Sequence, residues 1–457
     1  MNRKEPKKPI ATVATGTEER QDSAYWLLIF YLFLIFFRPF DLVPSLKVLH
    51  SPMITGGLCV VVYVTTRFFR GQTIFPLSPI TKVLAALSVW ILITIPFAFW
   101  IKGSLTTFYN DWSKLIILFL LLANVLQSAK QVNQAVWVCV LGATGVSIIA
   151  VALYVFLGES VSEGRLVSDA SGLYSGSNFF SMTLILLLPY ALFFFFLSRK
   201  VVVRVLCAFI IVMFSVANMM TESRAGVMGE TLVILLVFWK LRDWGVSLFK
   251  TLGIACLAAV LCLPLAPKGL WERFSTLFMD YDINKLDPLS KEHSALGSKE
   301  QREVLLVRAL IITVENPIFG IGMNNFPSKS HERFNSGPED WLGCHDTFLQ
   351  ISSELGIPGL ALYLLLLWTT WTTIKSTRAR LRGREGGDLP DSQQLRLLAD
   401  ATMVSFCGYV LFSAVAHLGY QPYYFVVAGF AQSLSFISIR RAEAAAAKLS
   451  PTPAVAA

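Results

Sequence analysis

Charged residues are scarce in this chain. They make up 15% of its 457 residues, whereas soluble globular proteins carry about a quarter. Hydrophobic residues make up 54%, and they gather in continuous runs close to the roughly 20 residues with which a helix crosses a bilayer. The runs do not alternate polar with apolar positions, which excludes a transmembrane β-barrel. The composition therefore predicts an all-α, polytopic helical membrane protein.

The chain also lacks the spacings that mark metal sites, disulfides and secretion. No arrangement of histidine, cysteine and acidic residues suggests a zinc site, so we expect neither a metal nor a cofactor. Six of the seven cysteines lie inside apolar runs and only Cys344 is predicted outside the membrane, so no disulfide framework is expected. The first apolar run lacks a small-residue cleavage site, which argues against a cleavable signal peptide.

Twelve apolar runs predict about twelve transmembrane helices, with a long loop between helices nine and ten. When these spans are placed alternately across the membrane, 24 of the 39 lysines and arginines fall at the termini and in one set of loops. The positive-inside rule then puts both termini in the cytoplasm and the long loop in the periplasm. The net charge of +9 is thus a topology signal, and no nucleic acid is expected as a partner. The predicted spans lie at roughly 24–39, 52–66, 83–100, 115–126, 134–157, 180–197, 205–220, 227–239, 252–265, 347–374, 397–419 and 423–439.

The predicted topology also places the loops between the spans. A short outer loop is expected around Asp111, and a basic cytoplasmic loop from Arg378 to Arg396. The sequence Gly356-Ile-Pro-Gly359 should break or kink the tenth helix near its outer end. The chain is thus expected to divide into five parts: a disordered cytoplasmic N-terminus at 1–23, helices one to nine at 24–266, a periplasmic catalytic loop at 267–346, helices ten to twelve at 347–439, and a cytoplasmic tail at 440–457.

The long loop is expected to contain an interfacial helix at 299–315. Ser298-Lys-Glu-Gln301 resembles a capping box, and Asn316-Pro317 should end the helix. Its body is apolar over much of its circumference but too short to span a bilayer, so we expect it at the membrane interface. Arg302 and Arg308 would then be held at headgroup depth, where the pyrophosphate of a lipid carrier sits.

Arg224 is a further candidate cation, in the short outer turn TESRAG. Arginine binds phosphate oxygens through bidentate hydrogen bonds and stays charged at any working pH. The alternative is an anchor that reaches the interface or pairs with Glu222. Arg165, in the outer loop EGRLVSDASG, is a third candidate cation, with plain solvation in the loop as its alternative.

His345 stands before Asp346 at the head of the tenth span. A histidine at a membrane boundary next to an acid can act as a general base near neutral pH, and the alternative is a hydrogen-bonded histidine that caps the helix. Glu354, one to two turns further on, is either a second base or the partner of an arginine. The remaining histidines are interpreted as background: His50, His293, His331 and His417.

Two short motifs are set aside. Asp280-Tyr-Asp282 resembles the acidic triplet with which nucleotide-sugar transferases hold a divalent metal, but it lies on the outer side, where nucleotide sugars are not expected. Gly320-Ile-Gly322 has no preceding strand and no third glycine, so it is not a dinucleotide fingerprint. We assign a function to neither motif.

Taken in order, these pieces resemble the bacterial O-antigen ligase/O-antigen polymerase superfamily of membrane glycosyltransferases. Arg302 stands fifteen residues before Pro317, which is the spacing of that family. Three positions depart from its pattern: Ser177 replaces a proline, Asp346 an asparagine and Leu306 a tryptophan. The matching motifs are Arg165…Gly172…Asn178, Thr221-x-Ser223-Arg224-x-Gly226, Arg302, Asn316-Pro317-x-Phe319-Gly320-x-Gly322, His345 and Glu354-x-Gly356-x-Pro358-Gly359.

The resemblance implies a reaction at the periplasmic face of the bacterial inner membrane. Such enzymes transfer a glycan from undecaprenyl pyrophosphate to a sugar hydroxyl. Ligases use lipid A–core as the acceptor, and polymerases use another lipid-linked repeat unit. We expect Arg224 and Arg302 to bind the pyrophosphate without a metal, and His345 to orient or deprotonate the acceptor, with inversion at the sugar. The further expected substrate-binding residues are Arg165, Arg308, Glu354 and Asn178.

The expected partners are the undecaprenyl-pyrophosphate-linked glycan donor, the glycan acceptor and membrane lipids. We favour a ligase over a polymerase because of the twelve predicted spans, the loop size and the absence of a large C-terminal periplasmic domain. A secondary transporter is the alternative from another class, but it usually has repeated halves and broken helices at matching positions, and neither is found. A purely structural subunit would not need outward-facing arginines beside apolar helices.

Overall fold

The computed structural model describes residues 23–42, 45, 50–157, 161–162, 165–166, 172–174, 176–247, 253, 271, 291–334, 342–382 and 391–449. In these residues the regular secondary structure is helical, apart from β1 (Val161–Ser162) and β2 (Arg165–Leu166), which pair antiparallel. The α-helices are α1 (Ser23–Phe36), α2 (Pro39–Leu42), α3 (Ser51–Phe69), α4 (Pro79–Thr94), α5 (Ile101–Thr107), α6 (Ser113–Val125), α7 (Ala129–Ala152), α8 (Ser177–Leu197), α9 (Val201–Met220), α10 (Arg224–Leu241), α13 (Lys291–Glu315), α14 (Phe326–Phe334), α15 (Thr347–Arg382), α17 (Ser392–Ser413) and α18 (Pro422–Leu449).

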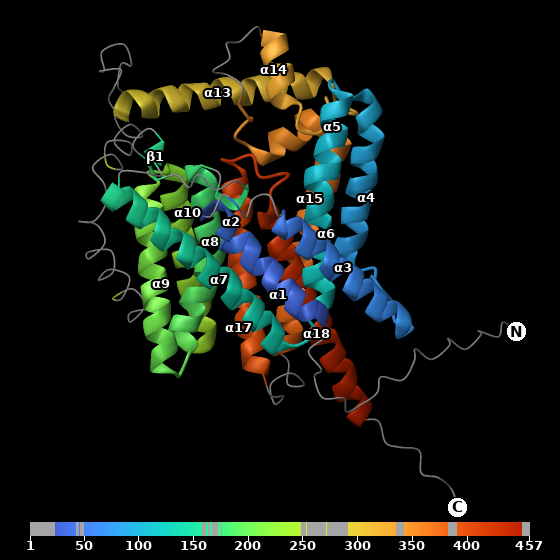
Figure 1. Cartoon of the computed structure of the whole chain (residues 1–457), viewed down its shortest axis with the longest axis vertical. Helices are drawn as coiled ribbons and strands as arrows, with labels where there is room; N and C mark the ends of the chain where they lie inside the picture. The colour runs from blue at the N-terminus through green and yellow to red at the C-terminus, as the bar shows by residue number, and fades with distance from the viewer. Residues whose placement is uncertain are drawn as a thin grey trace, which may run out of the picture.

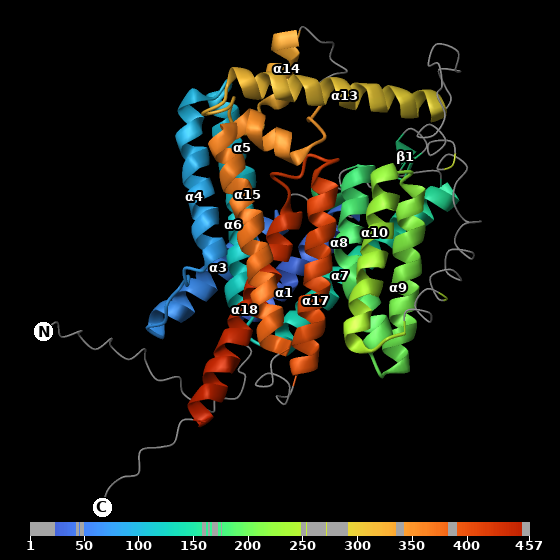
Figure 2. The same cartoon turned by 180° about the vertical axis from the view of Figure 1, so that it is seen from behind.

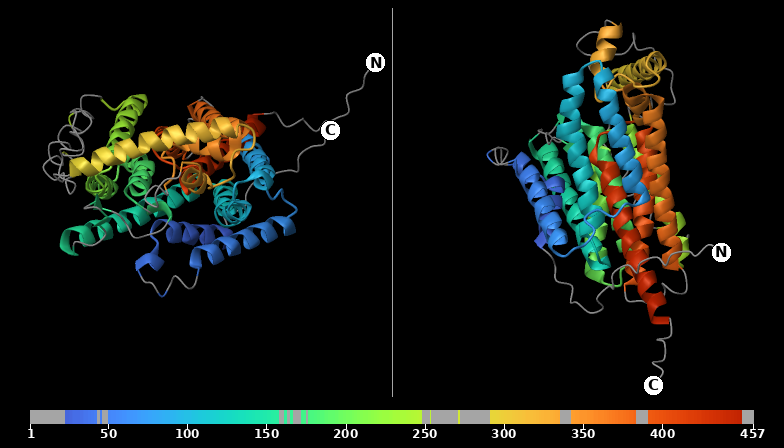
Figure 3. Two further views of the ribbon diagram at one scale, coloured as in Figure 1. Left: turned by 90° about the horizontal axis from the view of Figure 1, so that it is seen from above. Right: turned by 90° about the vertical axis from the view of Figure 1, so that its right-hand side faces the viewer.

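Most of the long helices run side by side, and α13 lies across one end of this bundle (Figures 1 and 2). Seen from above, α13 crosses over the ends of other helices (Figure 3, left). We call this the α13 end; α14 and the β1–β2 hairpin lie there too. The N-terminus of α1 and the C-terminus of α18 lie toward the opposite end (Figures 1 and 2). Residues of α13 are therefore held at one end of the bundle and not at its middle.

Nine helices in the described part of the chain are long and apolar enough to cross a membrane, so the protein is a multi-pass membrane protein. α1 is shorter, with 14 residues, and α10 carries three charged residues, Arg224, Glu230 and Lys240. The predicted ninth span, at 252–265, lies outside the described residues apart from one position. The count of twelve spans stays a prediction. The nine spans are Ser51–Phe69, Pro79–Phe97, Ile101–Val125, Ala129–Phe156, Ser177–Leu197, Val201–Met220, Thr347–Arg382, Ser392–Ser413 and Pro422–Ala444.

The short outer loop predicted around Asp111 is wrong. Residues Ile101–Val125 form one continuous helical segment, in which Phe108–Trp112 is a π-helical turn between α5 and α6. Asp111 is exposed on this turn, and Trp112 is buried. A π-turn adds a residue without breaking the helix, so it accommodates a polar residue that hydropathy reads as a loop.

The bounds predicted for the basic loop from Arg378 to Arg396 are wrong at both ends. α15 continues to Arg382 and α17 begins at Ser392, while residues 383–390 lie outside the described residues. Arg378 is buried and forms an ion pair with Asp400 of α17, which also accepts a hydrogen bond of 2.9 Å from the indole of Trp244. This buried pair holds α15, α17 and the end of α10 together, because a charge there is tolerated only when it is compensated. Hydropathy treats such an arginine as a loop residue and misses its partner.

Candidate active site at the α13 end

α13 begins earlier than the sequence predicts. Its first residue is Lys291 and not Lys299, so Ser298-Lys-Glu-Gln301 lies inside the helix and is not its capping box. The helix ends at Glu315, immediately before Asn316-Pro317, as predicted. Residues 291–300 contain several good helix formers, which carry the helix through Gly297.

One aliphatic face fixes α13 on the bundle. Its buried residues Leu305, Ala309 and Ile312 follow helical spacing, and Arg302 precedes them on the same face and is half-buried. The hydroxyls of Thr313 and of Ser352 in α15 are 3.0 Å apart. Five other apolar residues of α13 are exposed: Val304, Val307, Leu310, Ile311 and Val314.

The predicted break in α15 is confirmed at Gly356, whose φ of 70° and ψ of 180° are open only to glycine. The segment after α13 occupies the break. The Ile321 amide donates to the Ser353 carbonyl at 3.0 Å, the Gly322 amide to the Glu354 carbonyl at 2.8 Å, and the Ile357 amide to the Pro317 carbonyl at 2.8 Å. These bonds satisfy backbone groups that the break would otherwise leave unpaired.

Glycine is required on both sides of this contact. A Cβ on Gly320, whose φ is 65°, would lie 2.3 Å from the Glu354 carbonyl carbon, and one on Gly356 would lie 2.0 Å from the Ile318 oxygen. Phe319 stacks on Phe97 and on Trp90, with ring centroids 4.0 and 5.9 Å apart. The two glycine-containing motifs are therefore the two halves of one backbone contact that docks α13 on α15 and α4.

Glu354 is fully buried, and its carboxylate serves this same contact. One oxygen accepts a hydrogen bond of 3.0 Å from the Asn324 amide, and the other accepts one of 3.1 Å from the Phe326 amide at the start of α14. A carboxylate at a helix N-terminus is stabilised by the free amides and by the helix dipole. This geometry supports a structural role for Glu354, and the predicted contact with substrate stays a prediction.

His345 lies two residues before the start of α15 and has a left-handed φ of 54°. The cap of α15 is Asp346 and not His345, because Asp346 Oδ1 accepts a hydrogen bond of 2.7 Å from the Leu349 amide. Because Asp346 is the cap, the half-buried imidazole of His345 is not used for capping.

His417, interpreted from the sequence as background, contacts His345. The two imidazole rings are 5.2 Å apart between centroids, and His417 also meets Phe179 edge-on at 5.3 Å. Thr347 holds the segment before α18 in place: its hydroxyl donates to the Ala416 carbonyl at 2.6 Å and accepts from the Leu418 amide at 2.9 Å. No local signal marks His417, because its partner lies two helices earlier in the chain.

Asn178 closes the cluster on the side of α10. Its Oδ1 accepts a hydrogen bond of 2.8 Å from the Ser223 hydroxyl, and that hydroxyl caps α10 by accepting from the Gly226 amide at 3.0 Å. Arg224, the first residue of α10, directly follows Ser223 and is half-buried. Contacts thus lead from the Arg224 turn through Asn178 and its neighbour Phe179 to His417 and His345.

The charge of Arg302 also acts on His345. Burial, the neighbouring His417 and the positive charge of Arg302 lower the pKa of His345 from 6.5 to about 3. Burial lowers the pKa of His417 to about 4. Both imidazoles are therefore neutral near pH 7 and can accept a proton or a hydrogen bond.

Two of the predicted cations have other surroundings. Arg308 donates to the Ser330 hydroxyl at 3.5 Å and lies over the ring of Phe334 at 5.3 Å, so its guanidinium contacts α14. Arg165 lies in β2, and its side chain is outside the described residues. Their part in substrate binding stays a prediction. Among the residues that the structure describes, no three histidine, cysteine or acidic side chains are placed to hold a metal ion.

Protonation of His345 should not lower kcat/KM between pH 8 and pH 5. With a pKa of about 3, its imidazole stays neutral over this whole range. A histidine of ordinary pKa would lose its neutral form about 30-fold at pH 5. The measurement is the pH dependence of kcat/KM for glycan transfer, which reports the free enzyme. A loss of that size with a midpoint near 6.5 would contradict the low pKa.

The middle of the chain also matches a known family. Residues 209–364 match the family model described as O-antigen ligase, a range that contains Arg224, Arg302, His345 and Glu354 but neither Asn178 nor His417. No curated protein matches the chain. The match covers both glycine-containing motifs and the α13 cation. Over residues 209–364 the protein thus carries an O-antigen ligase-type domain, which is that of a membrane enzyme of the glycosyltransferase type.

Proposed function

We propose that the protein is an O-antigen ligase that transfers a glycan from undecaprenyl pyrophosphate to a sugar hydroxyl of lipid A–core. The observation that carries this is the match of residues 209–364 to the O-antigen ligase family model, a range that contains both Arg302 and His345. A cation and a neutral imidazole in one half-buried site match an anionic leaving group and a neutral acceptor. The family match supports lipid-linked glycans as the substrates.

The leaving group is a pyrophosphate, so its charge needs stabilising more than its oxygen needs a proton. Arg224 and Arg302 supply that charge in a site partly shielded from water, where fixed cations are worth more than in solution. Both remain charged at any working pH. These two charges can therefore support transfer without a metal. The acceptor hydroxyl attacks the sugar carbon from the side opposite the pyrophosphate, which inverts the configuration of that carbon.

His345 accepts the hydrogen bond, and then the proton, of the acceptor hydroxyl. Its pKa of about 3 leaves it neutral but weakly basic in the free enzyme, because burial and the Arg302 charge both disfavour imidazolium. Binding of an anionic pyrophosphate next to Arg302 offsets that charge and raises the pKa of His345. Donor binding thus makes the base stronger only when a leaving group is present.

We infer the placement in the membrane from the α13 end of the bundle. The exposed aliphatic face of α13 suits the apolar side of a membrane interface, and α13 lies across the helices that span the bilayer (Figure 1). We place the α13 end in the periplasm of a bacterial inner membrane and both termini in the cytoplasm, with twelve spans and a catalytic loop over 267–346. Cysteine labelling from either side of the membrane at exposed Glu332 and at Lys375 tests this orientation.

The decisive experiment is transfer in vitro from a polyprenyl-pyrophosphate-linked glycan, with lipid A–core or a second lipid-linked unit as the acceptor. Product on lipid A–core, unchanged by a chelator, is the expected result. Growth of the lipid-linked chain instead would make the protein a polymerase. A deletion strain separates the two as well: loss of a ligase leaves long lipid-linked polymer, whereas loss of a polymerase leaves core capped with a single unit.

His417→Phe is expected to lower kcat about 10- to 100-fold while the protein stays folded. Phenylalanine keeps the ring that packs on Phe179, but it removes the imidazole that positions His345. Since His417 also lowers the pKa of His345, the acid limb of kcat/KM should move to higher pH. His50→Phe, at an exposed position before α3, is the control. An unchanged kcat together with an unchanged acid limb would refute the role of His417.

A further inference from the structure

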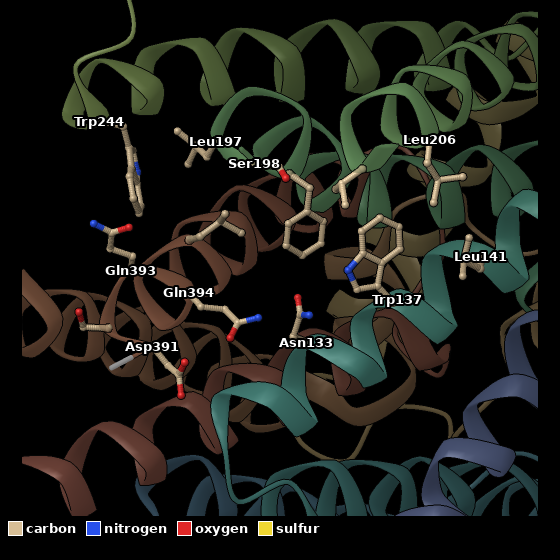
Figure 4. A pocket seen from close by; sticks show the side chains of 14 residues that line it. Asn133, Trp137, Leu141, Leu197, Ser198, Leu206, Trp244, Asp391, Gln393 and Gln394 are labelled. Atoms are coloured by element: carbon tan, nitrogen blue, oxygen red, sulfur yellow. The ribbon is translucent and has the colours of Figure 1, made fainter. Parts of the chain in front are cut away.

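A cavity of about 850 Å³ lies at the end of the bundle opposite α13. Figure 4 shows it from close by: α7, the turn between α8 and α9, η6 (Arg242–Trp244) and the start of α17 surround it. It is distinct from the candidate active site, since none of the residues that line it belongs to the His345 cluster. Its lining residues include Asn133 and Trp137 of α7, Ser198, Leu206 and Gln394.

The cavity is amphipathic. On its apolar side Trp137 stacks on Phe194, with ring centroids 5.0 Å apart. On its polar side the amides of Asn133 and Gln394 are turned toward each other (Figure 4). The Oδ1 atom of Asn133 is buried and accepts no hydrogen bond from any described residue. A buried carbonyl oxygen of this kind is stabilised by a ligand that brings a hydroxyl donor.

The apolar side opens onto the membrane-facing surface. Leu141 and Leu206 line the cavity and are also 45% and 37% exposed. Leu141 is shared with a second, wholly apolar groove of about 600 Å³ between α1 and α7. The two together offer a continuous apolar path from the polar end of the cavity along α7, of the kind that an acyl chain occupies.

Cations lie beside the cavity at the lining residue Ser198. Arg199 and Lys200 are exposed in the turn that contains Ser198, and Arg204, exposed at the start of α9, donates from Nε to the Ser198 carbonyl at 2.6 Å. The one acid in the lining, Asp391, forms an ion pair of 3.6 Å with Arg441. At the end of a membrane bundle, three cations beside an apolar path complement a lipid phosphate.

We propose that this cavity binds an anionic glycerophospholipid of the leaflet at that end, such as phosphatidylglycerol. Its phosphate lies at Lys200 and Arg204, a glycerol hydroxyl donates to Asn133, and an acyl chain follows Trp137 and Leu141. The lipid joins α7 to the α8–α9 turn and to α17. The site takes a lipid from the leaflet away from the active site, and it is independent of the proposed transferase function.

The test uses the full chain in phosphatidylcholine nanodiscs with a trace of phosphatidylglycerol that carries a photoreactive acyl chain. Cross-linked peptides are then mapped by mass spectrometry. We expect peptides that contain Trp137–Leu141 and Leu197–Leu206 to be labelled about fivefold more than by a phosphatidylcholine probe with the same chain. Arg204→Gln should remove this preference, whereas Lys375→Gln, an exposed cation elsewhere at the same end, should keep it.

Three outcomes would overturn the proposal. Equal labelling by the two probes would show that the headgroup is not recognised. Labelling spread over all membrane-facing helices would show that no site exists. Preferential labelling of the same peptides by a photoreactive polyprenyl phosphate, in competition with phosphatidylglycerol, would identify a different occupant. None of these readouts depends on glycan transfer, so they do not rise or fall with the proposed function.

Discussion

Replacing Arg302 by alanine should reduce glycan transfer to a small residual rate while the protein still inserts and folds. Arg302 is half-buried on the face of α13 that packs on the bundle, close enough to His345 to lower its pKa. Removing a preorganised charge from such a site costs about 10²- to 10³-fold in rate, since little water is present to replace it. The measurement is kcat for transfer from the polyprenyl-linked donor, with thermal unfolding in detergent as the check on folding.

Arg333→Ala is the matched control for this variant. Arg333 is also a cation at the α13 end, but it is exposed and pairs with Glu315 on the surface, where an ion pair contributes little. A second readout separates charge from packing: without Arg302 the pKa of His345 rises, so the acid limb of kcat/KM moves to higher pH. Normal product from Arg302→Ala would refute the assignment of Arg302 to the pyrophosphate.

Gly356→Ala should destabilise the protein by about 3 kcal/mol and remove activity with it. The backbone at Gly356 has a conformation that side chains do not adopt, which alone costs about 1–3 kcal/mol. The added Cβ would also lie 2.0 Å from the Ile318 oxygen, so the backbone contact between Pro317 and Ile357 has to open. The measurement is the unfolding midpoint, together with protease cleavage between α13 and α15.

Gly57→Ala provides the comparison. Gly57 lies inside α3, and nothing comes within 4 Å of an added Cβ. Alanine there is expected to be neutral or to stabilise the helix by up to about 1 kcal/mol, because glycine is the weaker helix former. If Gly356→Ala unfolded at the same temperature as Gly57→Ala, the backbone contact described above would not hold α13 in place.

The residues that we propose for the chemistry were predictable to different degrees. Arg224, Arg302 and His345 stand out because charged groups beside apolar helices are costly and rare. His417 does not, since it becomes notable only when Thr347 brings the segment before α18 against His345. Glu354 is an obvious candidate in sequence, but it accepts hydrogen bonds from two backbone amides, and backbone geometry leaves no trace in residue type.

Hydropathy determined that this is a membrane protein and where most of its helices lie, and the motif Gly356-Ile-Pro-Gly359 determined that one of them is interrupted. These are local properties: burial of apolar side chains in lipid and the freedom of a single glycine follow from neighbouring residues. The tertiary structure decided the rest: which histidine meets which, that Asp111 and Arg378 lie in helices, and that two glycine motifs form one contact. Such facts depend on partners far apart in the chain, and only packing brings those partners together.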